Sequence, residues 1–121
     1  MATNVVILIV SDEKPVLKLL RANLKKEYQV VTATDAMSAV KLLKEHRPGL
    51  VIYDMTTADV ENLDALASLR PHCNVPIIVL TARNGVASLH PILADEDEHI
   101  IKPFDIQEFL SRVRARLKGS K

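Results

Sequence analysis

Five short apolar runs alternate along the chain with longer segments of mixed polarity. The runs are rich in β-branched residues and show no strict alternation of polar and apolar positions, which is typical of strands buried on both faces of a parallel sheet. We therefore expect strands at residues 5–10, 29–33, 50–53, 76–80 and 100–101. Between them, apolar residues recur at intervals of three and four, which predicts amphipathic helices.

Capping and breaking residues delimit the predicted helices. The first covers residues 14–24, with Pro15 suited to its first turn, and the second follows the N-cap Asp35 and ends before Pro48. The third carries Leu63, Leu66 and Leu69 and stops at Pro71, and the last follows the N-cap Asp105. Asp12 also suits the N-cap of the first helix.

The segment 82–98 has the least regular pattern. Apolar residues from Val86 to Leu93 fit two helical turns, although Pro91 interrupts them. The four acids of residues 95–98 are interpreted as a solvated loop, and the basic residues of the last helix as a solvated face. Those basic residues are Arg112, Arg114, Arg116 and Lys118.

Strands that each precede a helix, with connections too long for hairpins, predict an α/β fold with a doubly wound parallel sheet and helices on both faces. The right-handed crossover rule and the chain length favour the flavodoxin-like strand order 2-1-3-4-5. The length of 121 residues suits one domain covering residues 1–121.

Composition narrows the choice of partner and compartment. The net charge of +1 gives no indication of a nucleic-acid or membrane partner. No apolar run approaches the roughly 20 residues that span a bilayer, and residues 1–4 lack the basic segment of a signal peptide, so we expect a cytoplasmic protein. The single Cys73 excludes an internal disulfide and a thiolate metal cluster.

Polar residues follow four of the five predicted strands: Asp12, Asp54, Thr81 and Lys102. In the predicted topology they converge at the carboxyl edge of the sheet, where open α/β sheets bind ligands. Two carboxylates at about 4 Å repel by about 4 kcal/mol at an effective dielectric of about 20, and a cation offsets this repulsion. Mg²⁺ is commonly held by one or two carboxylates, and an added hydroxyl and ammonium suit phosphoryl transfer to Asp54 as the nucleophile.

The four stretches 10–13, 51–54, 76–82 and 101–104 together resemble the receiver domain of response regulators in two-component signalling. The resemblance covers essentially the whole chain. It implies that Asp54 accepts a phosphoryl group from a histidine of a sensor kinase or phosphotransfer protein. It also implies that Asp12, Asp54 and the main-chain carbonyl of Thr56 hold Mg²⁺.

By the same resemblance, Thr81 and Lys102 contact the phosphoryl group, and His99 occupies the position of an aromatic switch residue. The peptide bond between Lys102 and Pro103 is expected to be cis. The face made by the fourth helix, fifth strand and fifth helix is expected to change on phosphorylation. The domain would assist its own phosphorylation and dephosphorylation without being an enzyme, and would act on a fused or separate output domain. A homodimer through the fourth and fifth helices is left open.

Several positions depart from the family pattern. Ser11 replaces the first of two adjacent acids, Thr57 and Ala58 replace a Met-Pro pair, and Asp95 and Glu96 replace small residues. The alternative is therefore a phosphorylation-independent interaction module of the same fold. We set aside a flavin-binding electron carrier because residues 11–15 lack a glycine-rich phosphate loop and aromatic residues are few.

Overall fold

The computed structural model describes residues 5–55, 59–82, 85–89 and 91–118. The strands are β1 (Val6–Val10), β2 (Gln29–Ala33), β3 (Leu50–Asp54), β4 (Ile77–Thr81) and β5 (Glu98–Ile101). The helices are α1 (Lys14–Leu24), α2 (Ala36–His46), α3 (Val60–Leu69), α4 (Val86–Leu89) and α5 (Ile106–Lys118), with a 3₁₀ turn at Arg70–His72.

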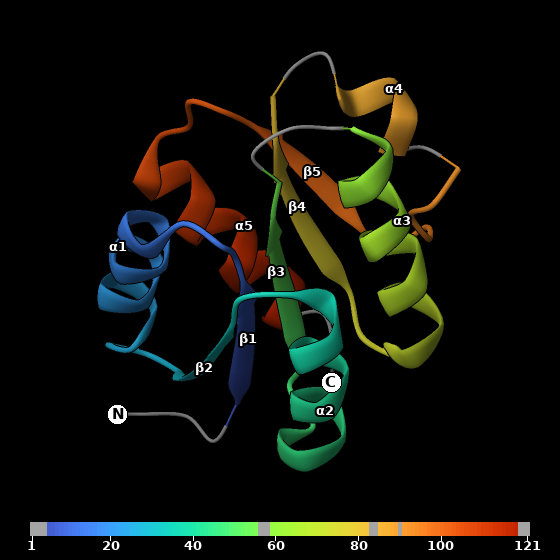
Figure 1. Cartoon of the computed structure of the whole chain (residues 1–121). Coiled ribbons are helices and arrows are strands. Elements are labelled where there is room, and N and C mark those ends of the chain that lie inside the picture. The colour runs from blue at the N-terminus through green and yellow to red at the C-terminus, as the bar shows by residue number, and fades with distance from the viewer. Residues whose placement is uncertain (1–4, 56–58, 83–84, 90, 119–121) are drawn as a thin grey trace.

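All four strand pairings are parallel, and the sheet has the order β2-β1-β3-β4-β5. Helices α1 and α5 cover one face of the sheet, and α2 and α3 cover the other (Figure 1). The predicted fold class and strand order are thus confirmed.

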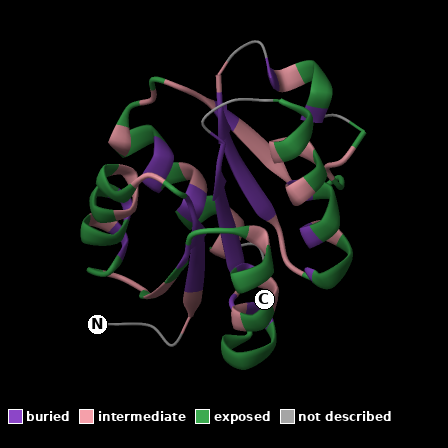
Figure 2. Ribbon diagram, viewed as in Figure 1, coloured by how far each residue is buried: buried purple, intermediate pink, exposed green. Residues whose placement is uncertain are grey.

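Alternate residues of each strand feed two apolar cores, one on each face. In β1, Ile7 and Ile9 pack with α1 and α5, whereas Leu8 and Val10 pack on the side of α2 and α3. The central strands β3 and β4 are buried along their whole length (Figure 2). This burial on both faces explains why the sequence shows continuous apolar runs rather than alternation.

The end of one helix and the N-cap of another differ from the sequence predictions, whereas the bounds predicted for α1 are confirmed. Helix α4 ends at Leu89, so the two turns expected up to residue 93 do not form. The N-cap of α1 is Glu13 rather than Asp12, because Pro15 lies in the first helical turn and sets the helix start. The cap at Asp35 is confirmed, since its side chain accepts a 2.7 Å hydrogen bond from the Ser38 N–H.

The prediction of a solvated acidic loop was wrong for Asp97 and Glu98. The Asp97 side chain is fully buried, and its oxygens accept 2.8 Å hydrogen bonds from the N–H groups of Ile77 and Ala94. Its Oδ2 also lies 3.0 Å from Nε of Arg70. Asp97 thus satisfies the backbone at the start of β4, and β5 begins at Glu98, two residues before the predicted position of 100.

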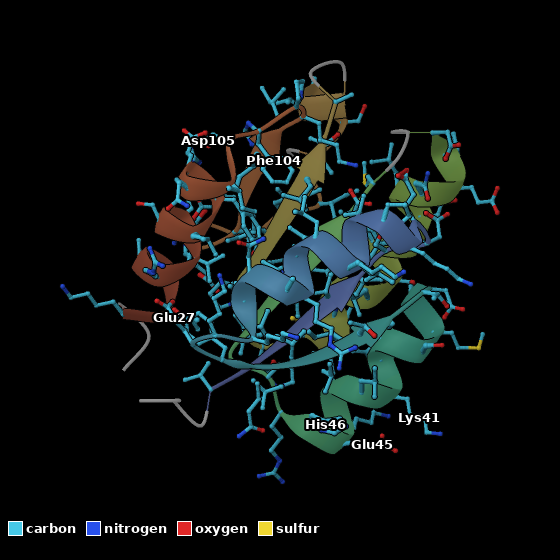
Figure 3. The ribbon with its side chains drawn as sticks, turned by 90° about the vertical axis from the view of Figure 1, so that its left-hand side faces the viewer. Glu27, Lys41, Glu45, His46, Phe104 and Asp105 are labelled. Atoms are coloured by element: carbon cyan, nitrogen blue, oxygen red, sulfur yellow. The ribbon has the colours of Figure 1, made fainter. Side chains whose placement is uncertain are left out.

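The basic residues of α5 are solvent-accessible, as expected, but three of them pair with acids. Arg112 and Arg116 both form ion pairs with Glu98 on the neighbouring strand. Arg114 pairs with Glu27, which lies near the far end of α5 from Phe104 and Asp105 (Figure 3). The α5 face is therefore charge-balanced by acids brought to it by the fold.

Among the described residues, the structure contains no helix with the length and apolar character needed to cross a bilayer.

Candidate functional site

Asp54 is the last residue of β3, and only 6% of its surface is exposed. Its Oδ2 accepts a 2.8 Å hydrogen bond from the hydroxyl of Ser11. Its Oδ1 forms an ion pair with the ammonium of Lys102 but accepts no hydrogen bond from the described residues. One oxygen of this buried carboxylate is therefore fixed by Ser11, and the other is held only by the Lys102 ammonium and keeps a lone pair for an electrophile.

Lys102 reaches Asp54 from the end of β5, two strands away in the sheet. Its backbone N–H donates a 2.8 Å hydrogen bond to the Thr81 carbonyl, and its ammonium donates one of 3.3 Å to the Met55 carbonyl. The Lys102–Pro103 bond is cis, as the resemblance predicted. These contacts hold the ammonium beside the carboxyl end of β3.

Ser11 and Asp12 lie just beyond β1, on the other side of β3 from Lys102. Asp12 and Asp54 line the same cavity of about 200 Å³, together with Asp35 and Glu61. The pKa of the neighbouring Tyr53 hydroxyl is raised, first by burial and then by the carboxylates of Asp12 and Asp35. The cavity therefore has a negative electrostatic potential.

The donor set suits a hard divalent cation. Asp12 and Asp54 supply two carboxylates to the cavity. Mg²⁺ commonly binds one or two protein carboxylates, and waters complete its coordination. The Ser11 hydrogen bond fills only one lone-pair position of the Asp54 Oδ2, so this oxygen has a second position available for a metal ion. Thr56, whose carbonyl the sequence resemblance added to this set, lies outside the described residues. Within those residues there is no group of three or more acid, histidine or cysteine ligands.

Thr81 is brought to the same edge of the sheet, but its hydroxyl does not bond to Asp54. It is 1% exposed, and its Oγ1 donates a 3.2 Å hydrogen bond to the carbonyl of Ala82. His99 lies elsewhere, because it sits on β5 and lines a cavity of about 320 Å³ with Val86 and Leu89 of α4. The structure therefore groups Ser11, Asp12, Asp54 and Lys102, with Thr81 at the same edge of the sheet and His99 outside this group.

Sequence reasoning missed the contact made by Ser11. The sequence presented this residue only as the loss of an acid, whereas the structure makes it the hydrogen-bond donor to Asp54. Ser11 directly follows β1, and β1 lies next to β3 in the sheet. This position was the signal that could have predicted the contact.

A comparison with protein families matches residues 7–114 to the response regulator receiver domain. The chain belongs to this family. The receiver domain is also 37% identical over 114 residues to the transcriptional regulatory protein KdpE of Mycobacterium tuberculosis. That match covers 93% of this chain and 50% of the relative, so the chain spans about half the length of the curated relatives it matches. Receiver domains are generally phosphoacceptors rather than enzymes, and they typically use Mg²⁺.

Solved structures show the same fold. The receiver domain of the Francisella response regulator 1452 superposes with a TM-score of 0.78 at 23% identity, covering 98% of this chain and 100% of that one. A two-component response regulator from Clostridium difficile gives a TM-score of 0.81 at 21% identity, covering 96% of this chain and 98% of that one. At these identities the similarity establishes the architecture.

Proposed function

We propose that Asp54 of this receiver domain accepts a phosphoryl group from the phosphohistidine of a sensor histidine kinase or a histidine phosphotransfer protein. The observation that carries the proposal is the state of the Asp54 carboxylate. It is buried at a strand end, one oxygen is held by Ser11, and the other faces Lys102 without accepting a hydrogen bond from the described residues. A buried carboxylate whose second oxygen is paired with a lysine ammonium, rather than with fixed backbone donors, is typical of a reactive site.

In the transfer, the Asp54 Oδ1 forms a bond to phosphorus while the bond between phosphorus and the donor imidazole nitrogen breaks. The electron pair of the broken bond stays with the imidazole, which takes up a proton. Lys102 balances the negative charge of the phosphoryl oxygens as a point charge. Mg²⁺ held by Asp12, Asp54 and the Thr56 carbonyl would supply further positive charge at the same oxygens.

Phosphorylation adds a charge of about −1.5 to −2 at the carboxyl end of β3. The backbone N–H of Lys102 is hydrogen-bonded to the Thr81 carbonyl, and β5 pairs with β4. The added charge therefore acts on the ends of both β4 and β5. We expect the Thr81 hydroxyl to turn from the Ala82 carbonyl toward a phosphoryl oxygen. Movement of His99 in its cavity between α4 and β5 would then change the face of α4, β5 and α5.

The proposal extends to partners and location. A fused or separate output domain receives the signal, since the chain spans about half the length of a transcriptional regulatory relative. This domain makes no direct contact with nucleic acid in our proposal, as its net charge of +1 offers little attraction to phosphates. We place it in the cytoplasm, with the α4 and α5 face available for a homodimer, and assign it no enzymatic activity on a separate substrate.

The test is phosphorylation of the purified chain by phosphoramidate with Mg²⁺, followed by intact-protein mass spectrometry. The wild-type chain should gain one phosphoryl group, and the Asp54→Asn variant should gain none because an amide is not a nucleophile for this transfer. Asp64→Asn, which changes an exposed carboxylate on α3, is the matched control and should be phosphorylated like the wild type.

Amide NMR spectra provide the second readout. Addition of Mg²⁺ and then beryllofluoride, a mimic of the aspartyl phosphate, should shift signals near Asp12 and Asp54 and then at Thr81 and His99. If neither phosphoramidate nor beryllofluoride has an effect, the domain is an interaction module that works without phosphorylation. Phosphorylation of the Asp54→Asn variant would place the acceptor at another residue.

A further inference from the structure

Ser11 is held rigidly in the position where the family pattern has an acid. It is 2% exposed, and its backbone N–H donates a 3.0 Å hydrogen bond to the Ala33 carbonyl on the neighbouring strand. Its hydroxyl oxygen accepts a 3.1 Å hydrogen bond from the Glu13 N–H and donates one of 2.8 Å to the Asp54 Oδ2. The serine therefore connects the start of α1 to the carboxylate of β3.

The direction of these hydrogen bonds is set by chemistry. A backbone N–H can only donate, so it takes a lone pair of the Ser11 oxygen, and an ionised carboxylate can only accept, so it takes the hydroxyl hydrogen. The side chain is anchored at both contacts, which removes rotational freedom from both Ser11 and Asp54. Hydrogen bonds to charged acceptors are also the stronger kind.

This anchoring determines which Asp54 oxygen is left for chemistry. Oδ2 accepts the Ser11 hydroxyl, and the plane of the carboxylate then directs Oδ1 toward Lys102. Oδ1 accepts no hydrogen bond from the described residues. We propose that Ser11 is a positioning residue that presents the Asp54 Oδ1 to phosphorus by donating a hydrogen bond to Oδ2. This inference rests on the proposed function of Asp54.

The charge at residue 11 supports a positioning role. A carboxylate within hydrogen-bond distance of Asp54 would repel it and would need a cation to hold the pair in place. The serine hydroxyl instead attracts the carboxylate, so the orientation of Asp54 is built into the protein before a cation arrives. Loss of the hydroxyl should therefore slow phosphoryl transfer without a matching loss of Mg²⁺ affinity.

The experiment separates orientation from metal binding. Phosphorylation of the full chain by phosphoramidate is followed by mass spectrometry at saturating Mg²⁺, and the Mg²⁺ dissociation constant is measured by amide NMR titration. We expect Ser11→Ala to be phosphorylated about tenfold more slowly, the size of effect typical of losing a hydrogen bond to a charged group. Its Mg²⁺ dissociation constant should stay within about threefold of the wild-type value, since neither metal-binding carboxylate is removed.

Three further variants make the result specific. Ser11→Thr keeps the hydroxyl and should restore most of the rate. Ser68→Ala removes an exposed hydroxyl that bonds only locally, to the Ala65 carbonyl, and should match the wild type. Ser11→Cys replaces the hydroxyl with a thiol, which is of similar size but a weaker hydrogen-bond donor. Slower phosphoryl transfer is again expected for this variant. It serves as the test if Ser11→Ala does not fold.

The outcomes distinguish the two proposals. A wild-type rate in Ser11→Ala or Ser11→Cys would overturn the positioning role while leaving Asp54 as the acceptor. A rate loss fully matched by weaker Mg²⁺ binding would also overturn it, because Ser11 would then act on the metal. Failure of the wild-type chain itself to gain a phosphoryl group would overturn the proposed function, and the role of Ser11 with it.

Discussion

Asp54 and Asp97 are both buried carboxylates with a basic partner, yet their surroundings differ. Asp97 accepts hydrogen bonds from two backbone N–H groups and pairs with Arg70, so both of its oxygens are satisfied. Asp54 accepts one hydrogen bond, from a serine side chain, and its Oδ1 accepts none from the described residues. Both side chains are fully shielded from solvent, so burial alone does not distinguish them.

The difference indicates the role of each residue. A buried carboxylate whose lone pairs are filled by fixed backbone donors joins segments of the fold, here the start of β4 to the loop before β5. A buried carboxylate whose second oxygen is held only by the ammonium of a partly exposed lysine keeps a lone pair for chemistry. The number and type of hydrogen-bond donors around each acid therefore separates a structural carboxylate from a reactive one.

The largest predicted effect is the loss of stability when Asp97 is changed to asparagine, compared with the same change at Asp54. Asp97→Asn should lower the free energy of unfolding by about 3 kcal/mol, because its NH₂ group would face a backbone N–H or the Arg70 guanidinium. Asp54→Asn should change it by less than about 1 kcal/mol, since the amide oxygen can still accept from Ser11 and the partly exposed Lys102 can move toward solvent. Urea unfolding of both variants, monitored by circular dichroism, measures the difference.

Equal losses of stability in the two variants would contradict this distinction between the acids. A reversed order would mean that Asp54 is the carboxylate on which the fold depends.

An intermediate effect is expected at Asp35, an exposed acid that caps α2. The hydrogen bond from the Ser38 N–H lowers the pKa of the Asp35 carboxyl below its ordinary value of 3.8. Its contribution is therefore complete above that value and is lost as pH falls through the lower folded-state pKa. Asp35→Ala should lower Tm by a few degrees at neutral pH, and the gap to the wild type should narrow below about pH 3.8.

Thermal melts at a series of pH values test the role of the cap. Asp35→Asn is the control, because asparagine caps helices about as well as aspartate without a charge. A gap between wild type and Asp35→Ala that widens as pH falls would show that ionised Asp35 does not stabilise α2.

The smallest effect is expected at Glu98, whose partners are the side chains of Arg112 and Arg116 rather than backbone groups. These arginines are 42% and 34% exposed, so solvent screens the pairs. Glu98→Gln should cost less than about 1 kcal/mol, and most of that difference should disappear in about 1 M salt. Urea unfolding at low and high salt measures this difference. A loss of stability above about 1 kcal/mol that does not depend on salt would mean that Glu98 stabilises the fold as Asp97 does.

The sequence carried most of the local information about this domain. The apolar runs and helical periodicities predicted the strands, most of the helices and the order of the sheet, because burial of each element leaves a period in the sequence. The strand-end positions of Asp12, Asp54, Thr81 and Lys102 also followed from this pattern, since parallel strands share one carboxyl edge. These four positions required no knowledge of individual contacts.

Only the tertiary structure decided which donors surround each polar side chain. Asp97 receives a hydrogen bond from the N–H of Ile77, 20 positions away, and Asp54 receives one from Ser11, 43 positions away. The same acidic run that suggests a solvated loop therefore contains a carboxylate with both oxygens satisfied, and a serine that looks like a lost acid anchors Asp54. A hydrogen bond depends on distances of a few tenths of an ångström between segments that the fold brings together, and no local periodicity records those distances.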